Sequence, residues 1–308
     1  MRLLFNKGFL FYAEFNLRLF LLLLISKKDI LYANDMDTLL PNYVISKIVK
    51  KKLIFDSHEL FSEIPELTNR IRVKNFWLSL EKWLIPKLKN VITVSESIKR
   101  HYTYQYGISA TVIRNLPLET KAKKESFPFS IKNKKIILYQ GSINIGRGLE
   151  LMIETMRLLD DYILVIIGDG DILESLEEKV LTEQLERKVK FLGKVLPEKL
   201  KKLTPNADIG ISLEEDLGLN YRYALPNKVF DYIHAEIPVI VSDLPEMKKL
   251  IRNYRVGEVL TERTSETLAK IIISMKVESY AHHLKKAKKQ LNWSQEKKQL
   301  ISTLQSLE

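Results

Sequence analysis

Short apolar runs alternate with stretches of helical periodicity along most of this chain. In its first part, β-branched and apolar residues form four short runs, each ended by polar residues, at 30–33, 53–56, 91–94 and 111–113. Between these runs, apolar residues recur at helical spacing at 38–50, 70–88 and 96–106. Because strands and helices alternate, the pattern predicts βα units that form a parallel sheet.

A second βα series begins near residue 136. It contains six further apolar runs, at 136–140, 162–167, 189–192, 209–212, 239–242 and 256–260, and predicted helices at 149–159, 172–183, 197–203, 227–235, 244–251 and 265–275. We therefore predict an α/β protein of two doubly wound, Rossmann-like domains that face a cleft. The first domain is expected to be incomplete, with one or two βα units fewer than a full doubly wound half.

The same patterns predict where the domains begin and end. We expect an N-terminal domain at 1–117, a linker at 118–134 that lacks an apolar period, and a C-terminal domain at 135–276. The remaining residues, 277–308, form a basic amphipathic tail, and we expect this tail to cross back to the first domain.

The chain opens with a helical pattern that contains one strongly apolar run, at 19–25. Seven residues are far fewer than the ~20 required to span a bilayer. We expect this run to be buried in the core, because short apolar helices usually pack internally. The alternative is a helix that rests on a membrane surface.

The chain is basic, with 49 Lys and Arg against 38 Asp and Glu and a net charge of +11. This excess favours an anionic partner. No RNA-binding signature with stacked aromatics is present, so an anionic membrane is expected rather than nucleic acid. The chain has no cysteine, and its five histidines lack metal-ligand spacing. We therefore expect no metal and no cofactor.

Glycine-rich turns follow two predicted strands of the second series. Gly141, Ser142, Gly146, Arg147 and Gly148 follow the strand 136–140, where glycines permit tight turns and an arginine can hold phosphate. Such a turn is also a common way for a strand to reverse into a helix. A second turn, with Gly168, Asp169 and Gly170, follows the strand 162–167, and the favoured interpretation is a plain turn with an Asp cap for the next helix. The alternative is that its glycines form the floor beneath a nucleotide base.

The most informative segment is 224–242, where a polar entry opens a predicted helix that leads to a buried strand. Unpaired backbone N–H groups and the helix dipole attract anions to a helix N-terminus. Asn227 and Lys228 lie in the first turn of this helix, and Asp231 follows three residues later. We predict that Lys228 binds a diphosphate and that Asp231 accepts hydrogen bonds from ribose hydroxyls. An intrahelical ion pair between these two side chains is the alternative.

Carboxylates and one histidine follow two other predicted strands. The strand 209–212 is followed by three acidic residues, of which Glu214 is expected to bind donor hydroxyls, and the strand 53–56 is followed by His58 and Glu59. Ligands of open α/β sheets bind at the carboxyl edge of the strands. We therefore predict that His58 lines the cleft, oriented by a neighbouring acid, and positions the transferring sugar or the acceptor hydroxyl.

These segments together resemble the group-1 (family 4) glycosyltransferases of the GT-B fold. The resemblance extends over 30–308 and is strongest from 135 to 245, and its most specific part is the Pro-Asn-Lys-x-x-Asp-Tyr helix followed by Ile-Pro-Val-Ile-Val-Ser. It implies a retaining, metal-independent transfer from a nucleotide-diphosphate sugar to a saccharide or lipid-linked acceptor. The donor then lies on the C-terminal domain and the acceptor on the N-terminal one.

The resemblance also assigns roles to single residues. Arg147 stands at the second basic position of the family's phosphate loop, Asp231 at the second carboxylate of its paired-glutamate motif, and His58 at its N-domain histidine. The sequence departs from the family at Ser142, where many members have arginine, and at Tyr223, which occupies the place of the first carboxylate. His58, Arg147 and Lys228 are thus the expected catalytic residues.

Other functions remain open at this point. A sugar-nucleotide 2-epimerase shares the fold, but it requires more converging acids and histidines than are evident here. A non-catalytic subunit that binds nucleotide and supports a partner enzyme is the second alternative, and an NAD-dependent oxidoreductase lacks its GxGxxG fingerprint. The basic charge and the apolar stretch at 9–25 lead us to expect a cytoplasmic protein, peripheral on the inner face of a membrane.

Overall fold

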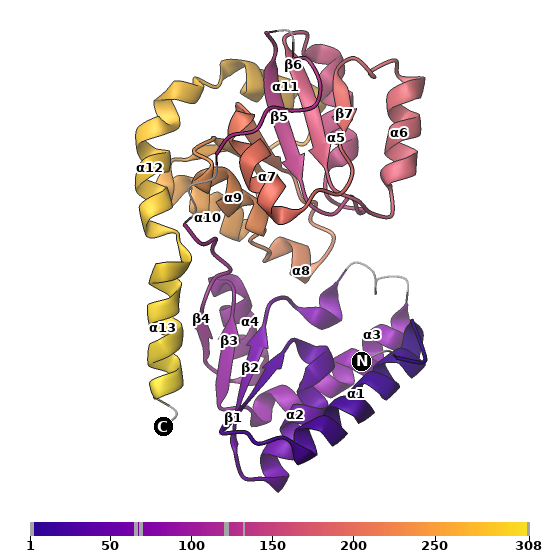
Figure 1. Ribbon diagram of the computed structural model, residues 1–308, viewed down its shortest axis with the longest axis vertical. Coiled ribbons are helices and arrows are strands. Elements are labelled where there is room, and N and C mark those ends of the chain that lie inside the picture. Colours follow the sequence, from indigo (N-terminus) through magenta and orange to yellow (C-terminus); the bar gives the residue numbers. More distant parts are fainter. Residues whose placement is uncertain (1–2, 65–66, 68–69, 120–122, 132, 307–308) are drawn as a thin grey trace. The chain divides into compact units, whose positions relative to one another are not determined.

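The computed structural model describes residues 3–306 except 65–66, 68–69, 120–122 and 132 (Figure 1). The chain divides into two compact units. Unit 1 contains Met1–Arg114, Gly218–Tyr223 and Lys298–Glu308, and unit 2 contains Asn115–Leu217 and Ala224–Lys297. Each unit is built on a parallel sheet, so the prediction of a two-domain α/β fold is confirmed.

Unit 1 has a sheet of four parallel strands in chain order: β1 (Ile30–Asn34), β2 (Lys52–Ser57), β3 (Asn90–Thr93) and β4 (Ala110–Val112). Its described helices are α1 (Gly8–Ile25), α2 (Met36–Ile48), α3 (Ile71–Leu84), α4 (Glu96–Tyr106) and α8 (Leu219–Arg222). The short helix α8 reaches unit 1 from far along the chain, and the Asn220 amide oxygen accepts a hydrogen bond from the Leu60 backbone N–H at 3.0 Å.

Helix α1 differs from the expectation for the apolar run 19–25. None of its residues is buried, and Leu21, Leu22 and Ile25 are exposed. The prediction of a core helix is therefore wrong, because only one side of α1 packs on the unit, with Tyr12 against Trp77 at 5.2 Å between ring centroids. Within the described part of the chain, α1 is also the helix whose length and composition would allow it to cross a membrane.

Unit 2 has a sheet of six strands in the order β10-β9-β8-β5-β6-β7. The strands are β5 (Lys135–Gln140), β6 (Tyr162–Ile167), β7 (Val189–Phe191), β8 (Ile209–Ser212), β9 (Val239–Ser242) and β10 (Gly257–Leu260). The chain adds β6 and β7 on one side of β5, then returns to add β8, β9 and β10 on the other side. The switch point of this doubly wound sheet therefore lies between β5 and β8, which pair in parallel.

Helices cover both faces of this sheet (Figure 1). One core contains Leu138 of β5 with apolar residues of α9 (Asn227–His234), α10 (Pro245–Tyr254) and α12 (Ala281–Gln290), and α7 (Pro197–Leu203) also packs there. The other contains Tyr139 of β5 with residues of α5 (Leu149–Thr155), α6 (Leu173–Thr182) and α11 (Ser265–Ser274). Successive residues of β5 thus enter opposite cores, as strand geometry requires.

The division between the units differs in detail from the sequence prediction. It lies between Arg114 and Asn115, so Leu116, expected in the first domain, is buried in unit 2. The segment 118–134, expected as a linker, also groups with unit 2, where Phe127 is buried. Helix α13 (Trp293–Gln305) belongs partly to each unit, since Lys298–Glu308 group with unit 1. Leu116, Phe127 and Phe129, which show no strand or helix period, hold the described parts of the segment 115–134 on the core.

We predict that Gly210→Ala destabilises the protein more than Gly193→Ala. A Cβ at Gly210 would lie 2.4 Å from the ring of Tyr232 on α9, whereas a Cβ at Gly193 would meet no atom within 4 Å. Overpacking costs about 1–3 kcal/mol, and the positive φ of Gly193 costs about 1 kcal/mol for alanine. Urea unfolding of both variants measures the difference, and equal losses would contradict the close packing of α9 on β8.

Candidate functional site

The loops after β5 and β8 meet at the switch point of the unit 2 sheet. The backbone N–H of Glu215, after β8, donates to the carbonyl of Gly146, after β5, at 2.8 Å. Ligands of doubly wound proteins bind outside the carboxyl ends of the strands at such a point. The topology therefore brings together residues that lie about 70 positions apart in the sequence.

Two glycines allow the loops after β5, β6 and β8 to approach one another closely. A Cβ at Gly148, which begins α5 with φ +72°, would lie 2.3 Å from the carbonyl oxygen of Leu213. A Cβ at Gly168, after β6, would lie 1.8 Å from the carbonyl oxygen of Gly141. The glycine turns after β5 and β6 are thus in direct backbone contact, and no larger residue fits at either position without displacing a loop.

The centre of the site is the carboxylate of Glu214, which is fully buried. One oxygen, Oε1, accepts from the Lys228 ammonium at 2.9 Å and lies 3.5 Å from a guanidinium nitrogen of Arg147. The other, Oε2, accepts from the Ser212 hydroxyl at 2.7 Å. We predicted that Glu214 would bind donor hydroxyls; its carboxylate is instead enclosed between two cations, which it holds at the switch point.

These contacts decide the charge state of the site. Burial by itself would raise the pKa of Glu214, but the nearby cations Lys228 and Arg147, together with hydrogen bonds from Lys228 and Ser212, lower this pKa below its usual value. Glu214 therefore stays ionised at neutral pH. Lys228 and Arg147 therefore flank an ionised carboxylate at the switch point, and cations at such a point suit an anionic ligand.

Lys228 lies in the first turn of α9, as predicted, but it is mostly buried. Its ammonium lies 4.1 Å from the centre of the Tyr139 ring, and a Cβ at Gly141 would lie 3.4 Å from its Cε. The cation thus stands directly beneath the glycine turn. An ammonium carries three N–H donors, and Glu214 occupies one of them. Asn227, the neighbouring candidate, is exposed at the start of α9.

A cavity of about 610 Å³ opens beside the glycine turns. Most of the predicted donor-binding glycines line it, together with polar and apolar side chains: Gly141, Ser142, Gly168, Asp169, Gly170, Asp171, Lys194, Val195 and Leu200 are among them. Asp169 accepts a hydrogen bond from the neighbouring Gly170 N–H at 2.9 Å. This cavity combines the Ser142 hydroxyl and the polar side chains of Asp169, Asp171 and Lys194 with an apolar wall of Val195 and Leu200, a mixture that suits a nucleotide.

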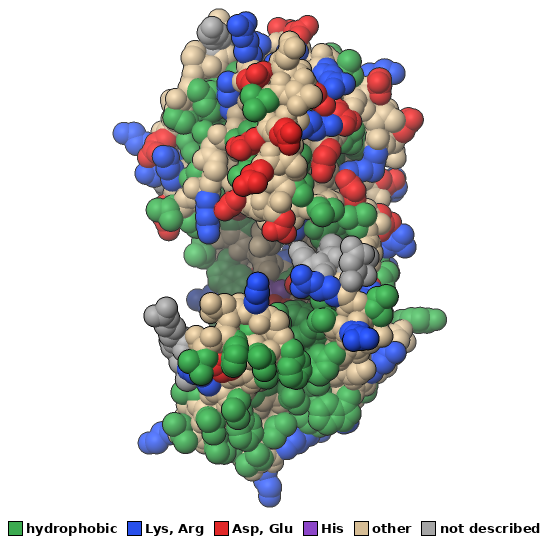
Figure 2. Space-filling model, turned by 90° about the vertical axis from the view of Figure 1, so that its right-hand side faces the viewer, with side chains coloured by type: hydrophobic (Ala, Val, Ile, Leu, Met, Phe, Trp, Pro, Cys, Tyr) green, Lys and Arg blue, Asp and Glu red, His purple; other side chains and the backbone are tan. Residues whose placement is uncertain are grey.

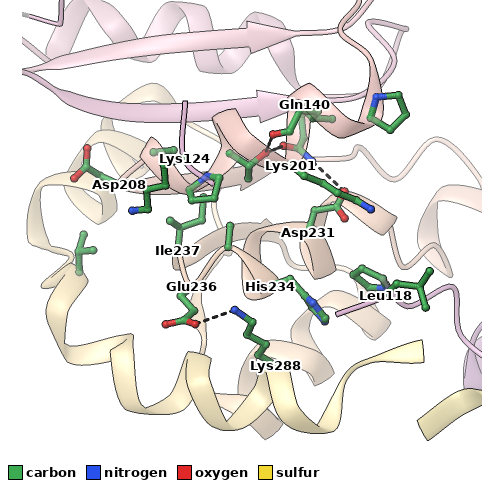
Figure 3. Close-up of a pocket in the computed structure, with 18 residues that line it drawn as sticks. Leu118, Lys124, Gln140, Lys201, Asp208, Asp231, His234, Glu236, Ile237 and Lys288 are labelled. Carbon is green, nitrogen blue, oxygen red and sulfur yellow. Dashed lines mark hydrogen bonds and ion pairs between the residues drawn. The ribbon is translucent and has the colours of Figure 1, made fainter. Parts of the chain in front are cut away.

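Asp231 lines a second cavity, of about 740 Å³, which shares Leu200 with the first (Figure 3). Its carboxylate does not pair with Lys228; it accepts from the Gln140 amide at 3.0 Å. The Gln140 side chain in turn accepts from the Thr204 hydroxyl at 2.8 Å. Burial raises the pKa of Asp231, although the Gln140 hydrogen bond and the charge of Lys201 act in the opposite direction.

His58 belongs to unit 1, where it follows β2. Its Nε2 lies 3.2 Å from Oδ2 of Asp56, and its backbone N–H donates to Asp35 at 2.9 Å. The same Asp56 oxygen accepts from the Tyr32 hydroxyl at 2.6 Å. The hydrogen bond with Asp56 raises the pKa of His58 above its usual value. The acid that orients His58 is therefore Asp56, whereas Glu59 accepts from the Asn220 amide of α8.

The sequence analysis missed Arg263, which follows β10 at the same edge of the sheet. Its guanidinium donates to the Ser242 hydroxyl at 2.8 Å and to the Leu213 carbonyl at 3.1 Å, and lies 3.6 Å from Glu215. These contacts fix the loop that carries Glu214. The rule that directed us to the other loops, a polar residue just beyond a predicted strand, would also have found Arg263.

Comparison with known proteins bears on the family and the fold. The family model of glycosyl transferases group 1 matches residues 121–298, more than half of the chain. The chain is 23% identical over 246 residues to a chitobiosyldiphosphodolichol beta-mannosyltransferase of Candida albicans, covering 70% of this chain and 52% of the relative. It is 26% identical over 229 residues to the O-antigen chain mannosyltransferase RfbU of Salmonella typhimurium, covering 68% and 61%. The chain thus spans little more than half the length of these curated relatives.

Solved structures share the fold at lower identity. The crystal structure of Anabaena HepE in complex with UDP superposes with a TM-score of 0.74 at 17% identity, over 96% of this chain and 82% of that one. Together with the family match, the doubly wound sheet with its glycine turns and cationic switch point allows one conclusion: this chain belongs to the group 1 glycosyl transferases, with the GT-B fold.

Proposed function

We propose that this chain is a glycosyltransferase that moves a sugar from a nucleotide-diphosphate sugar to a saccharide or lipid-linked acceptor. The transfer proceeds with retention at the anomeric carbon and without a bound metal. The observation that carries the proposal is the pair of cations, Arg147 and Lys228, that Glu214 holds beneath the glycine turn at the switch point.

The charges at the switch point suit the chemistry of the donor. Transfer breaks the bond between the anomeric carbon and a phosphate oxygen and forms a bond from that carbon to the acceptor oxygen. The departing nucleotide diphosphate gains negative charge as the bond breaks. Arg147 and Lys228, together with the N-terminus of α9, are fixed where they would stabilise this charge. The acceptor hydroxyl loses its proton during the step, and an oxygen of the departing phosphate can take it.

The residues that line the two cavities supply the remaining contacts of the donor. The cavity of Gly168–Asp171 and Lys194 has room for a base. Asp231, in a second cavity that Leu200 also lines, is the proposed acceptor of hydrogen bonds from ribose hydroxyls. The names of the two relatives support a mannosyl donor and an acceptor carried on dolichol diphosphate or on an O-antigen chain.

A direct test combines donor binding with turnover. The purified protein is incubated with uridine and guanosine diphosphate sugars, mannose among them, and both the thermal shift and donor consumption are followed with and without candidate acceptors. Donor consumption that depends on an acceptor supports transfer. A change in sugar configuration without an acceptor would indicate an epimerase, and binding without any turnover would indicate a non-catalytic subunit; either outcome contradicts the proposal.

We predict that Lys228→Ala weakens nucleotide diphosphate binding at least tenfold, because a charge-assisted contact contributes about 1.5–3 kcal/mol. Arg147→Ala, at a partly exposed side chain, should have a similar effect and remains informative if the Lys228 variant is unstable. Lys188→Ala is the control. Lys188 directly precedes β7, at the amino edge of the sheet, and pairs there with Asp160. Calorimetry that shows unchanged affinity in both site variants would remove these cations from the donor site.

We predict that Asp231→Asn weakens nucleotide binding and leaves the fold equally or more stable. Burial raises the pKa of Asp231, so the folded protein binds its proton more tightly than the unfolded chain does. The stability contributed by the protonated form is present at low pH and is lost as the pH rises through the folded pKa. The free energy of unfolding, measured with urea, should therefore fall less between about pH 4 and pH 7 in the variant than in the wild type. If Asp231→Asn binds the nucleotide as tightly as the wild type does, the proposed contact between Asp231 and the ribose is wrong.

We predict that His58→Ala lowers kcat more than it changes KM for the donor, since His58 lies outside unit 2. Asp56→Asn should lower the pKa of His58, because the hydrogen bond with Asp56 is what raises it; NMR titration of the imidazole measures this shift. His282→Ala, on the exposed surface of α12, is the control for kinetics. Equal rates for wild type and His58→Ala would exclude His58 from the reaction.

A further inference from the structure

We propose that unit 1 binds the surface of an anionic lipid membrane through an apolar face formed by α1 and the start of α3. We define the apolar face by the exposed side chains of these two helices: Phe9, Leu10, Leu17, Leu21 and Leu24 of α1, and Ile71, Val73 and Phe76 of α3. The proposal goes beyond donor chemistry, and it does not require that the proposed activity be correct.

Most of the large exposed residues of α1 follow one side of the helix, with Leu22 beside this stripe. Leu10, Leu17, Leu21 and Leu24 are separated by seven, four and three positions, so they form a single stripe on the helix surface. Leu17 is 60% exposed and Leu21 is 52% exposed. A stripe of large apolar side chains over the whole length of a helix is uncommon on a monomeric soluble protein and indicates an interaction surface.

The face continues from α1 onto α3. The rings of Phe9 and Phe76 meet edge to face, with 6.1 Å between their centroids, although Phe9 is 71% exposed and Phe76 is 48% exposed. Figure 2 shows hydrophobic side chains spread over a broad area of unit 1, on the side where α1 and α3 lie in Figure 1. The two helices thus present one apolar surface rather than scattered exposed residues.

The opposite side of α1 is anchored to the unit, which favours a helix that lies flat on a membrane. Tyr12 packs against the buried Trp77 of α3, and Trp77 also contacts Phe76 and Phe61. A helix that spans a bilayer would have to abandon these contacts. The 18 residues of α1 also extend only about 27 Å, somewhat less than the ~30 Å hydrocarbon core. A helix that lies in the membrane interface does not have to cross the bilayer, and it needs only one exposed apolar side.

The positive charge of unit 1 favours anionic over neutral lipid. Residues 1–114 contain 18 Lys and Arg and 10 Asp and Glu, a net +8 of the +11 of the whole chain. Lys7 precedes α1 and Lys27 and Lys28 follow it, whereas the acid within α1, Glu14, pairs with Arg18. Basic residues at both ends of an apolar helix suit anionic headgroups. The same charge would oppose the docking of a second copy through this face.

The test is flotation of the full chain with vesicles of phosphatidylglycerol and phosphatidylcholine, and with phosphatidylcholine alone. We expect binding to the anionic vesicles, weakened by high salt, and at least a tenfold loss in the double variant L17E/L21E. Both side chains are exposed, so the fold should tolerate the change. Leu181→Glu, on α6 of unit 2 and 61% exposed, is the matched control and should float like the wild type.

Several outcomes would overturn the proposal. Equal flotation of the wild type and L17E/L21E would mean that the apolar face is not the binding surface. Protein that stays with the membrane at alkaline carbonate pH would mean that α1 spans the bilayer. A lipid-free dimer that L17E/L21E abolishes would mean that the face binds a second copy. Nucleotide binding measured in solution should be unchanged in L17E/L21E, so failure of the membrane proposal and failure of the donor proposal are separable.

Discussion

The switch point of the unit 2 sheet depends on one buried charge, the carboxylate of Glu214. Taking an unpaired carboxylate out of water is very unfavourable, and a fold tolerates it only where cations and hydrogen bonds surround it. Here Lys228, Arg147 and Ser212 do so. Removal of one partner of a buried ion pair typically destabilises a protein by about 3–5 kcal/mol. The ion cluster therefore has two effects: it ties the loops after β5 and β8 together, and it sets the charge between them.

The packing of unit 2 holds this cluster in place. The Tyr232 hydroxyl of α9 donates to the Leu138 carbonyl of β5 at 3.0 Å, and its ring covers Gly210 of β8. These contacts place the N-terminus of α9, and with it Lys228, at the switch point. Arg263 fixes the loop that carries Glu214, because its guanidinium donates to the backbone carbonyls of Leu213 and Glu214. Both cations are therefore already oriented, and a ligand that binds them would not have to order them first.

Much of the fold could be predicted from the sequence, because local periodicity determines the elements. The boundaries of β6, β8, β9 and α7 match the prediction to the residue. Helix α8 was missed, since four residues are too few to show a helical period. The exposure of α1 was also missed, because an apolar run has the same composition whether it enters a core or faces a lipid.

The sequence predicts where the candidate residues lie, but not how they pair. Glycine turns and polar residues after strands lie at one edge of the sheet, because parallel strands share a carboxyl edge. The partners across that edge depend on topology: Glu214 pairs with Lys228 and Arg147, whereas Asp231 bonds to Gln140. Nothing in the local sequence distinguishes a carboxylate that faces a ligand from one that is buried as a counter-ion.

The most direct test of this account is a crystal structure with a nucleotide diphosphate bound. The account predicts that the diphosphate lies against the turn of Gly141 and Ser142, with phosphate oxygens accepting from Arg147 and Lys228 while Glu214 remains buried behind them. A diphosphate held elsewhere on the sheet edge, with both cations still turned only toward Glu214, would contradict it: the ion cluster would then be part of the core, and the donor would be bound by other residues.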